Sequence, residues 1–450
     1  MSRNSGIPPG PRYPGWIQAL GFWSRPLPYF ERCRARYGKR FTLRLPTVPP
    51  FVVLSDPSDV KEVFMAPPDV LHPGSGVARV LEPVLGSYSL IVLDEDPHME
   101  QRKLLLPALH GEKIQRLAGV MREVAEQDLA SWPRGEPVEL HPRFQKLTLE
   151  IILRSLFGLG PGPRLDALRD KLAAALAYGD SFVSLVPPQP GNRLSPLLER
   201  VGPYATFKRG QREADRMIFE LIEERRRDPA DRDDILSLLL EARHEDGSPM
   251  SGQEIRDELM TLLVAGHETT ASALAWAFER LPQHPEVVER LREEIDAGDG
   301  DDYLTATIYE TLRDRPVLPT ASPRLAMKPI EVGGWSYPAG VILIPNSYLI
   351  HHDPEIYDDP YAFRPERFLD EAPGTYTWFP FGGGRRRCVG SSFAMVELKI
   401  IMSAMLKSLD IVPDGGGREV AARRNITVRP SRGTRVVLRD RVREPALPAA

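Results

Sequence analysis

The sequence contains little cysteine, because Cys33 and Cys388 are the only two in 450 residues. Two thiols cannot form a disulfide framework and suit a reducing compartment, so we expect a cytoplasmic protein. The N-terminal stretch MSRNSGIPPGPRYP has neither the basic start nor the apolar core of a signal peptide. No apolar run reaches the roughly 18 residues that a membrane-spanning helix needs, so we expect no membrane span.

An excess of charge of one sign is also missing. The chain has 58 basic and 62 acidic residues, a net charge of -4, which argues against a nucleic-acid partner. There is no internal repeat, and 42% hydrophobic residues supply a large core. We expect a monomer with one domain over residues 1–450, in which 1–10 and 436–450 are loose tails.

What the sequence does contain is mostly helical periodicity, so the expected fold is mainly α with small β-sheets. Apolar residues recur at three-to-four spacing and predict helices at 114–131, 143–157, 204–227 and 234–243. Short apolar runs bounded by turn signals predict strands at 51–54 and 341–344.

The longest predicted helix begins at a capping box, in which Ser251 is followed three residues later by Glu254. The pattern continues to Leu281, where Pro282 stops it. About thirty residues at ~1.5 Å rise give a rod of ~45 Å, which is enough to cross a whole domain. We therefore predict that this helix is central and buried along much of its length.

The middle of this helix reads AGHETT, from Ala265 to Thr270. A glycine costs about 1 kcal/mol relative to alanine here, and threonine can bond back to the preceding turn and bend the helix. Small residues at 265 and 266 would let a flat ligand approach the backbone. A mere kink with a satisfied polar cluster is the alternative, and we interpret His267 as structural.

The stretch FGGGRRRCVG, residues 381–390, places Cys388 among glycines and arginines. A phosphate-binding loop would need a lysine followed by Ser or Thr, which this stretch lacks. A thioredoxin-like site would need a second cysteine nearby, and a zinc site would need further ligands nearby. A thiolate held against a bound cofactor fits better. The glycines at 382, 383, 384 and 390 let the backbone fold tightly and approach a planar ligand. The arginines and the start of a helix predicted at 391–409 favour an anion.

Two further groups of residues are ambiguous by themselves. His98 and Arg102 lie four apart on one helix face and could donate to an anion, although these residues alone favour an exposed helix start with ordinary surface charges. Glu310 and Arg313 can pair at i, i+3, and Arg367 could complete a Glu–Arg–Arg network.

Taken together, these motifs resemble those of the cytochrome P450 family over about residues 8–440. The haem-binding loop of the family resembles FGGGRRRCVG, and its oxygen-activation motif resembles AGHETT. The Glu-x-x-Arg pair of the family resembles ETLR (residues 310–313), and the segment that supplies the third network residue resembles FRPERF (363–368). The resemblance implies the cytochrome P450 fold, with the long central helix crossing over the haem, and haem b as cofactor.

The resemblance also implies a role for each matching residue. Cys388 corresponds to the axial thiolate ligand of the iron, which favours O–O cleavage. Glu268 and Thr269 correspond to the acid–alcohol pair that supplies protons during oxygen activation, and Glu310, Arg313 and Arg367 to a structural network. Other cofactor-binding positions, of which the first four contact the propionates, are His98, Arg102, Arg324, Arg386, Ala265, Phe381, Gly382 and Gly390.

The implied activity is that of a monooxygenase, which inserts one oxygen atom from O2 into a lipophilic molecule such as a fatty acid, terpenoid or steroid. About sixty residues follow Cys388, so we expect electrons from a separate ferredoxin or flavodoxin with its reductase. Arg385, Arg387, Lys103 and Lys399 are the expected docking patch.

The expected substrate pocket is mostly small or apolar, which suits a lipophilic substrate. Besides Ala265 and Thr269, its expected lining is the 176–190 region, Ser89, Ile91, Thr320, Ala321 and Ile426. A haem-thiolate peroxygenase or isomerase that needs no external electrons is the alternative function, and a non-catalytic haem binder or gas sensor is a third.

Overall fold

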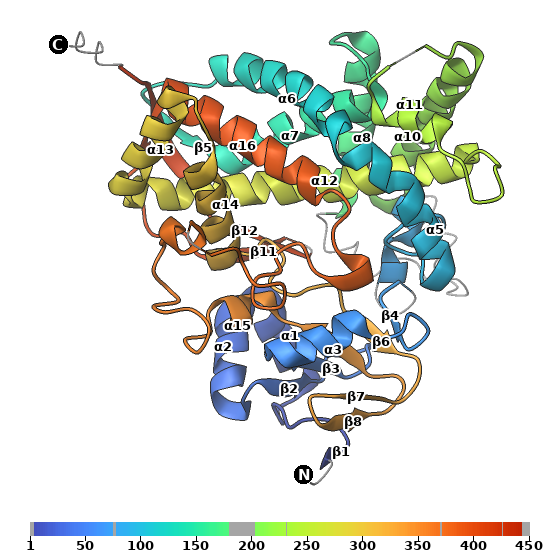
Figure 1. The fold of residues 1–450 in the computed structure, drawn as a ribbon, viewed down its shortest axis with the longest axis vertical. Coiled ribbons are helices and arrows are strands. Elements are labelled where there is room, and N and C mark those ends of the chain that lie inside the picture. Colours follow the sequence, from blue (N-terminus) through green and yellow to red (C-terminus); the bar gives the residue numbers. More distant parts are fainter. Residues whose placement is uncertain are drawn as a thin grey trace.

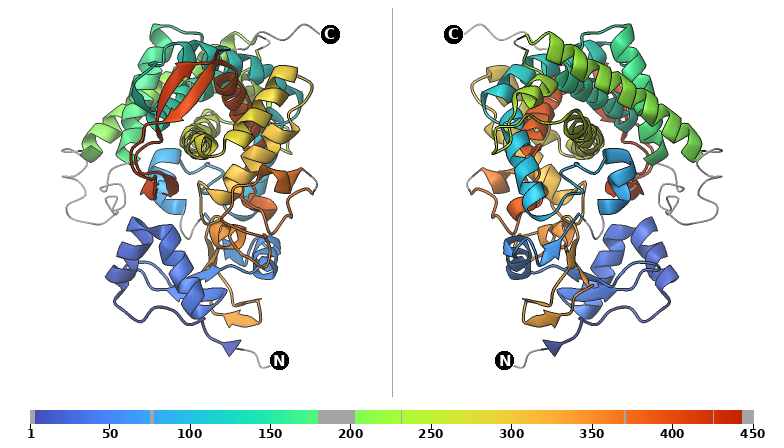
Figure 2. Two further views of the ribbon diagram at one scale, coloured as in Figure 1. Left: turned by 90° about the vertical axis from the view of Figure 1, so that its left-hand side faces the viewer. Right: turned by 90° about the vertical axis from the view of Figure 1, so that its right-hand side faces the viewer.

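Helix α12 (Gly252–Arg280) runs through the middle of the protein (Figure 1) and is seen end-on near the centre of both views of Figure 2. The predicted capping box is present: the Ser251 hydroxyl accepts from Glu254 N–H, and the Glu254 carboxylate accepts from Ser251 N–H. Of its 29 residues 19 are buried. The prediction of a long, largely buried central helix is therefore confirmed.

The computed structural model describes residues 4–74, 78–179, 203–230, 232–369, 371–424 and 426–442. Around α12 pack α7, α10, α14 and α16. The other helices lie around this group and toward the N-terminal part of the fold (Figure 1). Their bounds are α1 Gly15–Ser24, α2 Pro26–Tyr37, α3 Pro57–Met65, α4 Glu82–Leu85, α5 Glu95–Leu105, α6 Glu112–Ala130, α7 Leu140–Phe157, α8 Pro163–Gly179, α10 Pro203–Arg227, α11 Ile235–Glu241, α13 Pro285–Ala297, α14 Asp302–Asp314, α15 Ser347–His351 and α16 Ser391–Ser408.

Four small sheets complete the described part of the fold, as expected for a mainly α protein. The largest has the order β2-β3-β9-β6-β4 and contains both predicted strands, as β3 and β9; the others are β1-β8-β7, β10-β13-β5 and the hairpin β11–β12. Their bounds are β1 Asn4–Ser5, β2 Arg40–Leu43, β3 Phe51–Leu54, β4 Leu71–His72, β5 Pro137–Glu139, β6 Arg324–Ala326, β7 Ile330–Val332, β8 Trp335–Tyr337, β9 Ile342–Pro345, β10 Leu409–Pro413, β11 Ala421–Arg424, β12 Thr427–Pro430 and β13 Arg435–Asp440.

The expectation of loose tails is wrong for residues 436–440 and for the paired residues near the N-terminus. Strand β13 pairs along its length with β10 and in part with β5, so residues 436–440 belong to a sheet. Near the other end, β1 pairs with β8, and Thr42 donates from its hydroxyl to Pro8 and from its N–H to Pro9. Residues 1–3 and 443–450 lie outside the described part of the chain.

The Glu–Arg–Arg network forms as predicted, in the interior. The Arg313 guanidinium binds the Glu310 carboxylate at 2.7 and 2.9 Å, and both side chains are fully buried. Arg367 reaches the same carboxylate at 3.4 Å. Arg313 also donates to three backbone carbonyls between residues 351 and 362, so this network ties α14 to the segment that leads to the Cys388 loop.

No helix in the described ranges is long and apolar enough to cross a membrane.

We expect Arg313→Met to lower the free energy of unfolding by about 3–5 kcal/mol, because it leaves the Glu310 charge buried without its partner. Urea denaturation followed by circular dichroism measures this. The control is Arg216→Met, whose pair with Glu220 is exposed and should be worth less than about 1 kcal/mol. A loss in Arg313→Met no larger than in the control would contradict the role assigned to the network.

Candidate active site

The loop around Cys388 is closed by its own backbone, since Cys388 N–H donates to the Phe381 carbonyl at 2.9 Å. Gly382 and Gly384 have φ of 65° and 62°, which favours glycine. A Cβ atom at Gly383 would lie 2.3 Å from the Phe64 ring, and one at Gly384 2.3 Å from the Phe64 carbonyl oxygen. Gly383 and Gly384 therefore allow the loop to pack closely on α3. The sequence had suggested instead that these glycines let a flat ligand approach.

The sulfur of Cys388 lies two residues before the N-cap of α16, with Gly390 as the cap residue. Burial raises the pKa of this thiol and outweighs the Gly390 N–H and the charges of Arg102 and Arg387, which lower it. The arginines and the backbone N–H therefore favour the anion, as expected, but they do not offset burial. A metal ion reverses this balance, because a coordinating thiol loses its proton.

The Cys388 side chain is solvent-accessible even though it lies deep in the fold. Ala265 is likewise exposed and Thr269 half-buried, in the middle of a helix that is mostly buried. The accessible thiol and the accessible centre of α12 are the two features that a thiolate-bound planar cofactor requires.

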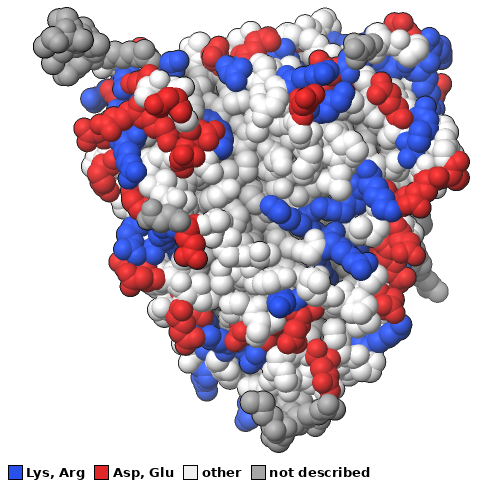
Figure 3. Space-filling view, viewed as in Figure 1, with Lys and Arg blue, Asp and Glu red and all other residues white. Residues whose placement is uncertain are grey.

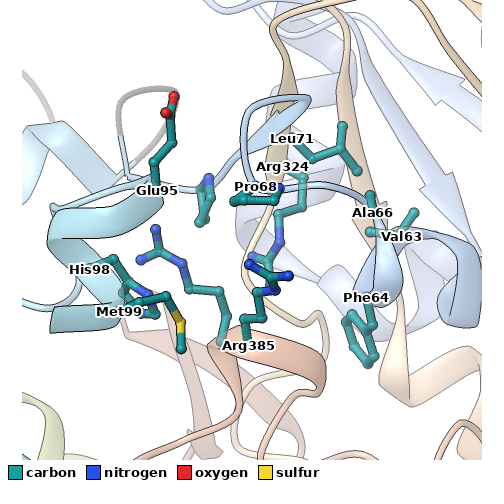
Figure 4. Close-up of a pocket in the computed structure, with 12 residues that line it drawn as sticks. Val63, Phe64, Ala66, Pro68, Leu71, Glu95, His98, Met99, Arg324 and Arg385 are labelled. Atoms are coloured by element: carbon teal, nitrogen blue, oxygen red, sulfur yellow. The ribbon is translucent and has the colours of Figure 1, made fainter. Parts of the chain in front are cut away.

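Four basic side chains form a second feature of the site: His98 and Arg102 on α5, Arg324 on β6, and Arg386 in the Cys388 loop. Arg386 pairs with Asp94 at 2.8 Å and donates to the Leu90 and Leu93 carbonyls. Figure 4 shows His98 and Arg324 on opposite sides of a pocket that Arg386 also lines.

The titration of these side chains fits an anionic ligand. Burial and the neighbouring cations lower the pKa of His98 to about 3 and that of Arg324 to about 9. Burial and Arg102 lower the pKa of Arg386 to about 10. His98 is therefore a neutral donor at pH 7. A group with two carboxylates would relieve the repulsion among the arginines, so the donor set fits the haem propionates.

Residues in the centre of α12 point toward different parts of the protein. The Thr269 hydroxyl donates to the Ala265 carbonyl at 2.7 Å, as anticipated from the motif. A Cβ at Gly266 would lie 3.5 Å from Ile152 of α7, so the side-chain position of this glycine points toward α7, which our interpretation did not anticipate. His267 is buried and bonds through Nδ1 to the Leu263 carbonyl, which agrees with a structural role.

Glu268 occupies a polar network that sequence reasoning did not find. Gln145 Nε2 and Arg424 contact its Oε2 at 2.5 and 3.2 Å, and His141 Nε2 lies 3.5 Å from Oε1. Burial raises the pKa of Glu268, but the bond to His141 and the charge of Arg424 outweigh it, so the pKa is lowered. The carboxylate is ionised at neutral pH. Apart from Ser272, four residues on along α12, its partners come from α7 and β11, distant in sequence, and no local motif marks them.

The expected pocket residues have different environments. Ser89 is fully buried, and its hydroxyl accepts from Thr261 at 2.7 Å. It therefore anchors the loop to α12 and offers no surface to a substrate, which corrects its assignment. Ile91 and Thr320 are half-buried, Ala321 is 7% exposed and Ile426 is 59% exposed. Of the 176–190 region, residues 180–190 lie outside the described part.

Lys and Arg side chains gather on the face between α5 and the Cys388 loop (Figure 3). Arg385 and Arg387 are exposed there. The two expected lysines contribute less free charge, because Lys103 pairs with Glu245 at 2.5 Å and Lys399 with Asp301 at 2.9 Å.

The sequence model for "Cytochrome P450" matches residues 8–437 of this chain. The chain belongs to the cytochrome P450 family. "Putative cytochrome P450 135B1" of Mycobacterium tuberculosis is 37% identical over 96% of this chain and 92% of its own length, and "Putative cytochrome P450 138" of the same species is 36% identical over 97% of each.

The fold is also that of solved cytochromes P450. The structure of retinoic acid-bound cyanobacterial CYP120A1 superposes with a TM-score of 0.83 at 23% identity, covering 98% of this chain and all of the other. The haem domain of cytochrome P450DA gives 0.83 at 22%, covering 98% and 99%. The cofactor is haem b, and the protein is an oxidoreductase of the oxygen-incorporating kind.

We expect Arg386→Ala to weaken haem retention about 10- to 100-fold, because it removes charge-assisted hydrogen bonds worth about 1.5–3 kcal/mol to the propionates. Transfer of haem to excess apomyoglobin measures this. Arg79→Ala, which removes an exposed arginine paired with Glu82, should leave transfer unchanged. Equal transfer rates in both variants would contradict the assignment of Arg386.

Proposed function

We propose that this cytochrome P450 is a monooxygenase that inserts one atom of O2 into a lipophilic small molecule, with electrons from a separate protein. The observation that carries the proposal is the ionised Glu268 carboxylate, followed in the sequence by the accessible Thr269 hydroxyl. Haem held by a thiolate supplies the cleavage of the O–O bond. The residues of the chain bind the haem, hold the substrate and handle protons.

Proton handling falls to Glu268 and its neighbours. Because the Glu268 carboxylate is ionised, it can accept a proton at neutral pH, and His141 and Arg424 hold it in one position. The Thr269 hydroxyl is adjacent in sequence and bonded to the Ala265 carbonyl, from which it can turn to bind water. Peroxide-driven or isomerase chemistry, the alternative, has no need of this arrangement.

The substrate is proposed to be lipophilic because the candidate lining at Ile91, Ala265 and Ala321 is small or apolar. A fatty acid, terpenoid or steroid-like molecule meets this description. Thr320 and Ile426 remain proposed members of the lining.

The electron donor is proposed to be a ferredoxin or flavodoxin with its reductase, working in the cytoplasm. Both kinds of donor carry acidic surfaces, and Arg385 and Arg387 are exposed in the Cys388 loop itself. Lys and Arg side chains gather on this face of the protein (Figure 3). Complementary charge speeds encounter and orients the partners.

We expect Thr269→Ala to lower the fraction of electrons that ends in product several-fold, because protons are then delivered without control. The assay compares NADH consumed with product formed, using a ferredoxin, its reductase, and a substrate chosen by a spin-state shift. Thr305→Ala is the matched control, since Thr305 makes the same bond to the carbonyl four residues earlier, on α14.

Unchanged coupling in Thr269→Ala would refute the role of this pair. Full turnover with hydrogen peroxide alone, and none with NADH and the redox proteins, would establish the alternative function instead.

A further inference from the structure

The outer face of α1 is apolar and aromatic although the helix lies at the surface. Trp16 is 64% and Leu20 62% exposed, and Ile17 and Trp23 are exposed as well. These positions are spaced three or four apart and so share one side of the helix, whereas Phe22 is buried on the other. Single exposed apolar residues are ordinary, but a row of them on one helix marks a contact surface.

The turn that follows β2 extends this surface. Arg44 N–H donates to the Gln18 side chain at 2.9 Å, and a Cβ at Gly15 would lie 2.6 Å from the Arg44 carbonyl oxygen, so the turn lies against α1. Val48 in this turn and Tyr13 before the helix are also exposed. We call Tyr13, Trp16, Ile17, Leu20, Trp23 and Val48 the α1 face.

The charge around the α1 face has one sign. The first acidic residue of the chain is Glu31, and residues 1–55 contain nine Lys and Arg against this one acid, in a chain with 58 basic and 62 acidic residues. Arg12, Arg25 and Arg44 are exposed beside the α1 face. Within the described ranges none of these three arginines has an ion-pair partner.

We propose that the α1 face docks the protein on the surface of a membrane that contains anionic lipids. A short helix with Trp and Leu on one side and arginines around it lies in the interface, with its rings among the headgroups. Each arginine near the surface adds attraction to anionic lipid and keeps its charged end in water. Helices α1 and α2, dark blue in Figure 2, lie at the periphery, where a flat surface can reach them.

The α1 face is also joined to the candidate active site by direct contacts. The Arg423 guanidinium lies over the Phe22 ring at 4.3 Å and the Trp23 ring at 4.6 Å. Its neighbour Arg424 pairs with Glu268. Docking would thus place the β11–β12 hairpin close to the lipid, where a lipophilic substrate concentrates. This last point rests on the proposed function, whereas docking itself does not.

The test is co-sedimentation of the full-length holoenzyme with vesicles of phosphatidylcholine, with and without phosphatidylglycerol. We expect binding at least about tenfold stronger to the anionic vesicles, falling as salt is raised. The double variant Trp16→Glu, Leu20→Glu should lose this binding. The triple variant Arg12→Gln, Arg25→Gln, Arg44→Gln should lose the preference for phosphatidylglycerol.

Met65→Glu, which alters an equally exposed apolar side chain on α3, and Arg216→Gln should bind as the wild type does. Haem absorption and the unfolding midpoint verify that each variant is folded. Failure of the wild type to bind anionic vesicles, or undiminished binding by the folded double variant, would overturn the proposal and would leave a protein partner as the occupant of the α1 face. NADH-driven turnover without vesicles reports separately on the proposed function.

Discussion

The site depends on the placement of one sulfur atom, that of Cys388, which the chain fixes from three directions. The bond from Cys388 N–H to Phe381 closes the loop, Gly383 and Gly384 press it against Phe64, and α16 begins immediately after it. Burial disfavours the thiolate in the polypeptide alone. Bound iron would supply the missing stabilisation, because a coordinating thiol loses its proton, and would thereby couple the state of this thiol to cofactor binding.

The rest of the site is arranged around buried charge. Glu310 and Arg313 compensate each other fully inside the protein, and Glu268 is held ionised by His141 and Arg424. Arg324 and Arg386 differ from these, because burial and a neighbouring arginine lower the pKa of each. Asp94 offsets only part of the positive charge of the donor set. The Glu310–Arg313 pair and the Glu268 network fix the positions of their side chains, whereas the excess positive charge around Arg324 and Arg386 favours binding of an anionic ligand.

The sequence allowed prediction of those features whose cause is local. The capping box at Ser251, the glycine–cysteine loop and the i, i+3 pair of Glu310 with Arg313 are read from neighbouring residues, and they formed as predicted. Features set by distant contacts escaped: the pairing that orders residues 436–440, the bond that buries Ser89 against Thr261, the orientation of Gly266 toward Ile152, and the partners of Glu268 on α7 and β11. Residue type alone does not say which side of a helix meets which neighbour.

The central claim is tested most directly by X-ray absorption at the iron edge of the purified holoprotein, which reports the atoms bound to the metal. The account predicts one sulfur neighbour at bonding distance in addition to the porphyrin nitrogens, and its disappearance in Cys388→Ser. A spectrum of the wild-type protein that is described fully by nitrogen and oxygen neighbours would contradict it.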